Sequence, residues 1–443
     1  MKYSKITYFL SGVLLLAAIA VSCVSTRPVY DPKDLSYLYN PLKTRINPRY
    51  SIFNESDNRS LLGVKFFTGD LFFSEANPAG VPMARMYIYA RLYNTTFGRV
   101  ITDTAYYDID IVKDPNKEEY LYKIPLKVQK GMEYVCEVKI YDKLRDFMIQ
   151  AFVPFNTTSD FNRYNFYVRG HLLKNELLKP VVRKDEYFNI FYGRGRPDSV
   201  FVSVYPLSED IPYPPSMVLP ERSVPVKPDT VIAIPYSDTL PLMLPEKGIY
   251  FFTVSREIRE GITLFNFGDD FPTMTTPEEM IKPLAYLLPE DELQKIASSE
   301  KPKVALDDFW LGCCNGNVEK ARELIRIFYT RAVFANYYFT SWKEGWRTDR
   351  GMIYIIYGPP DKLYKSSDVE TWGYRKPVVS SGWGARVSVK EEYLFFTFKK
   401  KDNPFTDNDY SLSRSETVVS YWDKAVQSWR KGIVFRLDNP EEI

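Results

Sequence analysis

The sequence has few of the residues on which acid-base, thiol or metal chemistry usually depends. It contains one histidine and four cysteines among 443 residues. A serine-histidine-aspartate triad would have to use His171, and no GxSxG motif is present. The cysteines match neither a disulfide framework nor a zinc spacing; they are Cys23, Cys136, Cys313 and Cys314. We therefore expect no metal site and no cofactor.

The sequence also lacks a large excess of charge of one sign and, after its N-terminus, a long apolar run. Lys and Arg number 58 against 56 Asp and Glu, which leaves a net charge of +2 without a long basic block. Such a chain does not track a phosphate backbone, so nucleic acid is excluded as a partner. After the N-terminus, no apolar run reaches the roughly 18 residues that span a bilayer. The sequence predicts no transmembrane helix in the mature protein.

The N-terminal residues have the pattern of an export signal. Lys2 and Lys5 precede a long apolar stretch, and the junction AVSC resembles a bacterial lipoprotein signal, although Ala20 stands where leucine is usual. We expect residues 1–22 to be a signal peptide, Cys23 to be lipidated and residues 23–47 to be a tether. An ordinary secretory signal is the alternative. Lipid would anchor the protein to the outer membrane, facing the periplasm because VSTRP lacks an acidic surface-export cluster; the cell surface is the alternative.

The region that follows is rich in strand patterns. Tyr (34), Phe (29) and Pro (31) are abundant, and short alternating segments are divided by proline and glycine turns. In YVCEVKI, for example, Cys136 shares one strand face with Val138 and Ile140, which indicates a buried thiol. We predict two tandem all-β, immunoglobulin-like sandwich domains, residues 48–160 and 161–268. The GRGR segment, Gly193 to Arg196, is interpreted as a charged hairpin turn.

Helical patterns begin near residue 270. Thr276, Pro277 and Glu279 form a capping box, and adjacent Cys313 and Cys314 are either free thiols or a vicinal disulfide. A long helix then starts at Asn317 and stops at Gly345, and its apolar residues recur at three- and four-residue steps. These residues are Ala321, Leu324, Ile325, Phe328, Ala332, Ala335, Phe339 and Trp342.

The stretch GWRTD, residues 345–349, is predicted to turn the chain from this helix into a buried strand, MIYIIY. Trp346 would bury its ring, Thr348 and Asp349 would bond nearby backbone groups, and Arg347 and Arg350 would flank the carboxylate.

The whole run FYTRAVFANYYFTSWKEGWRTDRGMIYIIYGPPDKLY, with LDDFW before it and ETWGY and LFFTFKKKDN after it, resembles the GWxTD domain. The resemblance covers about residues 270–412. It implies an envelope-associated bacterial protein, with Bacteroidota prominent, and supplies no catalytic assignment. We assign residues 269–443 to this α+β domain, helical first and then a small sheet.

A Bacteroidota origin would make a second pattern relevant. Exported proteins of those bacteria are O-glycosylated at Asp-Ser/Thr followed by a small apolar residue or threonine. Four matching tripeptides occur, which makes possible glycosylation sites of Thr104, Ser199, Thr230 and Thr239.

Three carboxylates form the best candidate catalytic set: Asp349, Asp361 and Glu370. The predicted strand could bring them to one end of a sheet as an acid-base pair, while structural pairing of Glu370 with Arg347 or Arg350 is the plainer interpretation. Trp372 and Tyr374 share a strand face and either stack on sugars or pack in the core.

We therefore expect a non-catalytic, lipid-anchored envelope scaffold that docks a protein partner through its C-terminal domain. Candidate binding residues are Trp346, Arg347, Asp349, Arg350, Trp372 and Tyr374. The alternative is a glycan- or peptide-acting hydrolase, or a sugar-binding module, in the same domain.

Overall fold

The computed structural model describes residues 33–438, except 173, 179, 216, 218–223, 225–226, 377–391 and 415; the side chains of 75 and 415–420 are also left out. The expected signal peptide and Cys23 lie outside the described residues. All contacts below lie within the unit that begins at Leu35. In the described part of the chain, no helix is long and apolar enough to cross a bilayer.

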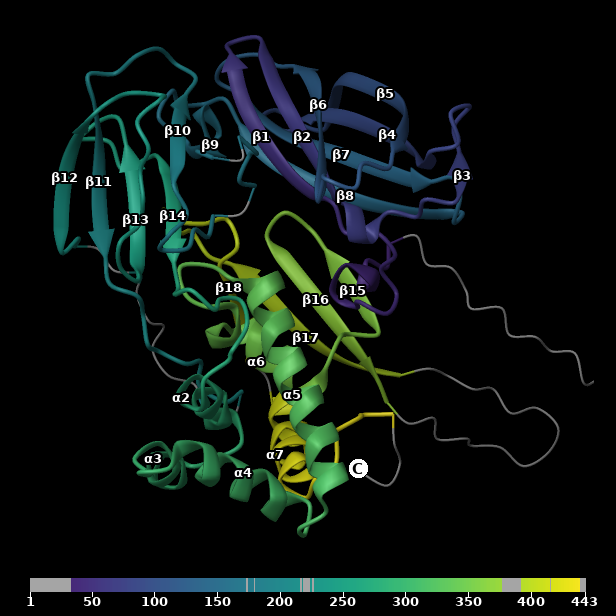
Figure 1. The fold of residues 1–443 in the computed structure, drawn as a ribbon, viewed down its shortest axis with the longest axis vertical. Coiled ribbons are helices and arrows are strands. Elements are labelled where there is room, and N and C mark those ends of the chain that lie inside the picture. The colour runs from purple at the N-terminus through teal and green to yellow at the C-terminus, as the bar shows by residue number, and fades with distance from the viewer. Residues whose placement is uncertain are drawn as a thin grey trace, which may run out of the picture. The chain divides into compact units, whose positions relative to one another are not determined.

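The first β region forms two antiparallel sheets around one apolar core (Figure 1). Alternate residues Met86, Ile88 and Ala90 of one sheet are buried with Leu62 and Val64 of the other. The elements are η1 (Ser36–Tyr39), β1 (Arg49–Ser56), β2 (Arg59–Phe67), η2 (Thr68–Asp70), β3 (Glu75–Ala76), β4 (Pro82–Asn94), β5 (Val100–Val112), β6 (Glu119–Lys127), β7 (Glu133–Asp142) and β8 (Phe147–Asn156). One sheet has the order β1-β2-β6; the other has β3-β4-β7-β8, with β5 on β4.

The second β region contains a two-stranded sheet, β10-β9, and a four-stranded sheet, β12-β11-β13-β14. Its elements are η3 (Arg163–Asn165), β9 (Phe166–Gly170), β10 (Phe188–Tyr192), β11 (Ser199–Tyr205), β12 (Thr230–Pro235), β13 (Gly248–Thr253) and β14 (Ile262–Asn266). The β-rich class expected from the alternating pattern is confirmed. The GRGR segment joins β10 to β11, which lie in different sheets, so it does not close the hairpin that we expected.

The C-terminal region packs helices on a four-stranded sheet, β15-β16-β17-β18. Its elements are α2 (Pro277–Ile281), η4 (Lys282–Tyr286), α3 (Glu290–Ala297), α4 (Pro302–Cys313), α5 (Val318–Phe339), η5 (Gly345–Arg347), α6 (Asp349–Tyr357), β15 (Lys362–Lys365), β16 (Val369–Arg375), β17 (Tyr393–Lys400), β18 (Tyr410–Ser413) and α7 (Glu416–Arg430). Residues of α5, α6 and β15 to β17 share one core (Figure 1).

The helix starts follow the sequence closely. The Asn317 side chain accepts a hydrogen bond from the Lys320 N–H at 3.0 Å, as an N-cap does. Thr276 likewise accepts from the Glu279 N–H at 3.3 Å, and Glu279 reaches back to the N–H of Thr275 at 3.3 Å, one residue before the expected cap. Both predicted N-termini are confirmed.

The end of α5 differs from the expectation. The helix stops at Phe339 rather than at Gly345, and Thr340 is its C-cap. The Thr340 hydroxyl donates to the carbonyl oxygen of Asn336, which competes with continuation of the helix. Most of the predicted apolar stripe is buried, but Ile325 is only half-buried and Trp342 lies beyond the helix in a separate cluster.

The apolar segment after GWRTD is a helix, so the predicted buried strand is wrong. The Thr348 side chain accepts from the Gly351 N–H at 3.0 Å and starts α6, and Gly358 ends it with φ +84°. Every residue from Arg350 to Tyr357 is buried. A helix that is buried on all sides loses its amphipathic period, so the periodicity of a short apolar run does not distinguish a helix from a buried strand.

Residues 35–47 are not part of a free tether. Leu35 and Tyr39 are buried in the C-terminal core, and the Leu35 N–H donates to the carbonyl oxygen of Leu363 in β15 at 2.8 Å. The Tyr37 hydroxyl bonds the backbone of Gln150 in β8, accepting at 2.8 Å and donating at 2.9 Å. This segment therefore holds the first β region and the C-terminal region together.

Candidate functional site

Gly345 begins the GWRTD corner because its backbone lies directly against α5. A Cβ at this position would overlap the carbonyl oxygen of Ala335 and would lie 2.7 Å from the Asn336 Cα. Only glycine permits this approach without a shift of the helix or the corner.

Trp346 is a core residue, with 2% of its surface exposed. Its backbone N–H donates a hydrogen bond to Asn336 Oδ1 at 3.0 Å, and its backbone carbonyl oxygen accepts one from the Tyr286 hydroxyl at 2.6 Å. The guanidinium of Arg347 lies over the indole ring at 4.4 Å and pairs with Glu344 at 2.5 Å. Neither side chain is open to a partner.

Asp349 lies at the start of α6, with 12% of its side chain exposed, and faces β18. Its carboxylate accepts from the Leu412 N–H at 2.8 Å and pairs with Arg414 at 3.4 Å. Burial raises the pKa of Asp349, against the lowering effect of Arg414. We expected Arg347 and Arg350 to flank this carboxylate, but Arg347 bonds Glu344 and Arg350 bonds Glu370.

Glu370 is the centre of a buried charge cluster. Its Oε1 accepts from Lys365 at 2.7 Å, from the Tyr39 hydroxyl at 3.0 Å and from Arg350 at 3.2 Å. Burial alone would raise the pKa of this carboxyl, but Lys365 and Arg350 outweigh that effect and lower it to about 2. Lys365 is one-third exposed, whereas Arg350 is 1% exposed. Arg350 thus depends most on Glu370.

The three candidate carboxylates each have their own partners. Asp361 is exposed and accepts a hydrogen bond from the Arg375 N–H at 2.9 Å. It shares none of the partners given above for Asp349 and Glu370. Glycoside hydrolysis needs two carboxyls that flank a bond in an open cleft. Glu370 is instead fully buried and Asp349 is only 12% exposed, and each is paired with an arginine, as structural carboxylates are.

Trp372 and Tyr374 lie on one face of β16, as the sequence indicates, and that face is inside the core. Trp372 is 0% exposed and Tyr374 is 4% exposed. The Tyr374 hydroxyl donates to the Gly358 carbonyl oxygen at 2.8 Å, and the Trp372 ring is 5.5 Å from that of Tyr39. A sugar has no open ring face to stack on here.

A cavity of about 850 Å³ lies next to the corner and is lined by all three regions. Asn336, which holds the Trp346 N–H, lines it, and so does Asn408. Arg350 donates to Asn408 Oδ1 at 2.6 Å, and Asn408 donates in turn to the Thr340 carbonyl oxygen at 2.9 Å. Trp346 of GWRTD and Arg350, the residue that follows it, therefore each hold one asparagine in the wall of this cavity.

Comparison with known proteins identifies this region. Residues 248–431 match the family model of the GWxTD domain. The chain contains a GWxTD domain. The match extends the resemblance of residues 270–412 in both directions, and it begins at the first residue of β13.

Other comparisons add nothing to the GWxTD assignment. The search of curated proteins returned no match. A crystal structure of Bacteroides uniformis β-glucuronidase aligns with 37% of this chain and 16% of its own length, at 11% identity and TM-score 0.19. B. uniformis β-glucuronidase 2, covalently bound to cyclophellitol-6-carboxylate aziridine, gives the same coverage and identity at TM-score 0.17. Scores this low support no inference about fold or activity.

Four residues that the sequence analysis did not single out complete the corner of the GWxTD domain: Tyr39, Asn336, Asn408 and Arg414. The sequence does contain a sign that Tyr39 is buried, because Leu35 and Tyr39 are apolar residues four positions apart, as on one face of a helix. Asn408 lies in the polar loop DNPFTDNDY, and Asn336 sits in a helix whose other buried residues are apolar or aromatic. Their partners are distant in sequence, so no local pattern marks them.

The remaining candidate side chains occupy ordinary positions. Cys136 is buried in β7, and Cys313 and Cys314 are free and buried. His171 bonds the side chain of Asn189 at 3.0 Å and lines the cavity. Within the described residues, no group of three metal-ligating side chains comes together.

The four possible glycosylation residues all lie in the β regions. Thr104 is exposed in β5, Thr230 is the exposed first residue of β12, Thr239 is exposed and Ser199 is half-buried.

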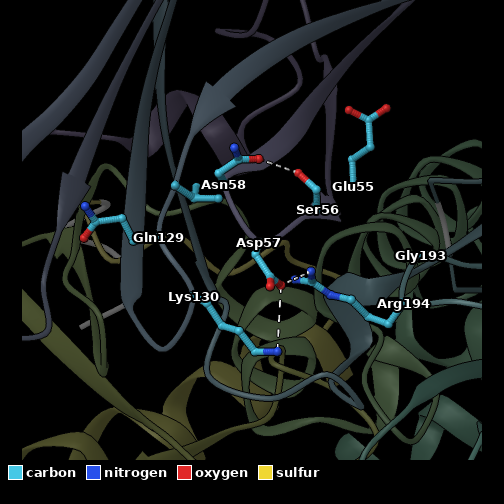
Figure 2. A pocket seen from close by; sticks show the side chains of 9 residues that line it. Glu55, Ser56, Asp57, Asn58, Gln129, Lys130, Gly193 and Arg194 are labelled. Carbon is cyan, nitrogen blue, oxygen red and sulfur yellow. Dashed lines mark hydrogen bonds and ion pairs between the residues drawn. The ribbon is translucent and has the colours of Figure 1, made fainter.

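A shallow pocket marks the junction of the two β regions at the GRGR turn. Figure 2 shows Arg194 and Lys130 converging on Asp57, at 2.6 and 3.8 Å. Arg194 also donates to Asn165 Oδ1 at 2.8 Å, and its side chain is 8% exposed. A Cβ on Gly193 would lie 2.8 Å from the carbonyl oxygen of Asn54. The turn therefore holds the second β region against the first through the contacts of Arg194 and Gly193.

Replacement of Arg194 by alanine should weaken the contact between the two β regions, because it removes the hydrogen bond to Asn165 Oδ1 and the nearer of the two cations at Asp57. Hydrogen bonds to charged groups contribute about 1.5–3 kcal/mol each, so we expect a loss near 2 kcal/mol in urea unfolding. Arg196, in the same turn, is exposed. The Arg196→Ala variant should unfold like the wild type. Equal losses of unfolding free energy in the two variants would show that Arg194 does not hold the two β regions together.

Proposed function

We propose that this protein is exported, anchored to the outer membrane through lipid on Cys23, and acts as a non-catalytic docking scaffold on the periplasmic side of the envelope. Two immunoglobulin-like sandwiches form its β regions, and the GWxTD domain supplies the docking site for an envelope protein. The N-terminal sequence pattern supports export and anchoring, and the arrangement of the corner supports docking.

The observation that carries the docking proposal is a pair of hydrogen bonds that reach the cavity wall, one from Trp346 of the motif and one from Arg350, the residue after it. Trp346 and Arg350 are buried, yet each bonds an asparagine that lines the cavity, Asn336 and Asn408. Groups arranged in this way fix a shape and leave no motif side chain free to react. A rigid concave surface between modules is a common place for a ligand or partner to bind.

The rim of the cavity is the surface on which a partner would rest. Leu172 is 81% exposed and Tyr187 is 44% exposed, and both line the opening. Exposed large apolar side chains around a cavity are typical of interaction sites. On this proposal the GWRTD corner positions the wall, and the rim makes the contact.

The test is affinity purification of the tagged full-length protein from detergent-solubilised envelopes. We expect one stoichiometric partner with the wild type and its loss with Tyr187→Asp and with Leu172→Asp, after circular dichroism confirms that both variants are folded. Val318→Asp is the matched control, because Val318 is 48% exposed on α5 and does not line the cavity. A partner that stays bound to both rim variants, or no stoichiometric partner, would refute docking at this cavity.

A further inference from the structure

Strand β12 is an outer strand of the sheet β12-β11-β13-β14. Its sequence, TVIAIP, has no charged residue, and Val231 and Ile232 are 54% and 48% exposed on opposite faces. Apart from β11, no strand pairs with it among the described residues. An exposed, uncharged edge strand is a template for another strand.

Other outer strands of this chain are protected against such pairing. The Tyr37 hydroxyl bonds the backbone of β8, Val182 bonds that of β14 and Leu35 bonds that of β15. The long strand β5 carries charge instead, at Asp103, Asp108 and Asp110. Capping and charge are usual means of blocking edges, and β12 carries no charge and has no such cap among the residues that the structure describes.

The register shows which backbone groups β12 presents. The Tyr236 N–H donates to the Asp198 carbonyl oxygen at 3.1 Å, and the register pairs Ile234 with Val200 and Ile232 with Val202. Hydrogen-bonded and non-bonded pairs alternate in an antiparallel ladder. Val231, Ala233 and Pro235 therefore turn their backbone groups outward, and Pro235 has no N–H to offer.

We propose that β12 pairs antiparallel with β12 of a second copy of this chain. Placing Val231 opposite Ala233 of that copy uses both outward N–H groups and avoids Pro235, and it sets the two Ile232 residues side by side. An isologous pair removes both open edges at once and brings no charges together. Because one strand pair buries less than a standard interface of about 1,600 Å², the dimer should depend on concentration.

Sedimentation velocity of the full chain in detergent tests the dimer over a wide concentration range. We expect the wild type to shift from monomer to dimer, and Ile232→Lys to remain monomeric because two ammonium groups would meet at the two-fold axis. Ile101→Lys on β5 is the matched control, since Ile101 is 54% exposed on a strand guarded by aspartates. That variant should dimerise like the wild type.

A charge-swap experiment separates self-pairing from general loss of stability. Ile232→Lys mixed with Ile232→Glu should restore the dimer, because opposite charges then meet across the axis, whereas Ile232→Glu alone should stay monomeric. The proposal is overturned if the wild type remains monomeric at every concentration, if Ile232→Lys dimerises unchanged, or if the mixture fails to associate.

Discussion

Replacement of Glu370 by glutamine should lower the free energy of unfolding by about 3 kcal/mol, because it breaks a buried ion pair from one side. Glu370 is 0% exposed, and Arg350, which is 1% exposed, would keep its hydrogen bonds to Asn408 but lose the negative charge that balances its own. Lys365 is one-third exposed and can turn to solvent, so the uncompensated charge on Arg350 accounts for most of the loss.

Urea unfolding followed by tryptophan fluorescence measures this loss. Asp361→Asn is the control, because Asp361 is an exposed carboxylate of the same domain that accepts a single backbone hydrogen bond from Arg375. We expect the control within about 0.5 kcal/mol of the wild type. If Glu370→Gln were as stable as the control, the cluster would not be holding the fold.

The same carboxylate predicts how stability depends on pH. The pKa of Glu370 is lowered from 4.5 to about 2 in the folded protein. A lowered carboxyl pKa contributes stability that is fully present above the unfolded value and is lost as pH falls from about 4.5 toward 2. The wild type should therefore lose stability over this range more steeply than Glu370→Gln.

Gly345→Ala should be the second strongly destabilising substitution, with a loss of about 3 kcal/mol, at the upper end of the usual range for overpacking. The added methyl group would overlap the Ala335 carbonyl oxygen and lie 2.6 Å from its carbonyl carbon. Both neighbours are backbone atoms, so the contact cannot be relieved by turning a side chain. The corner would have to move away from α5, and the hydrogen bond between Trp346 and Asn336 would stretch.

Gly312→Ala is the matched control for this prediction. Gly312 lies in α4, and an added Cβ would meet nothing within 4 Å. Alanine there should be neutral or stabilising by up to about 1 kcal/mol, because glycine is a poor helix former. Thermal unfolding of the two variants beside the wild type should show opposite or clearly unequal shifts. A Gly345→Ala protein as stable as the Gly312→Ala protein would show that the corner tolerates a side chain.

The named residues of the GWxTD motif now have physical roles in this fold. Gly345 allows the close approach to α5, Trp346 fills the core, Thr348 caps α6 and Asp349 fixes the start of that helix to β18. Arg347, at the variable position, bonds Glu344 and the carbonyl oxygen of Glu209. The motif is thus a joint between two helices and a sheet, and its residues need not touch a ligand to be required.

The sequence by itself determined the local features of this protein. Alternating apolar residues mark strands such as β4 and β7, because one face of each strand is more completely buried than the other. Asn317 and Thr276 mark helix starts because the capping hydrogen bond is made within three residues. The GWxTD resemblance rests on the same kind of contiguous information, and the family match confirms it.

Tertiary structure decided what depends on distant residues. The apolar segment of α6 is buried on every side, so its apolar pattern did not distinguish the helix from the expected strand. The role of Glu370 depends on Tyr39, which is 331 positions away and falls in a segment that the sequence presents as a tether. A polar side chain is stable in a core only when a partner meets it there. Such partners are brought together by the fold, and no local pattern records them.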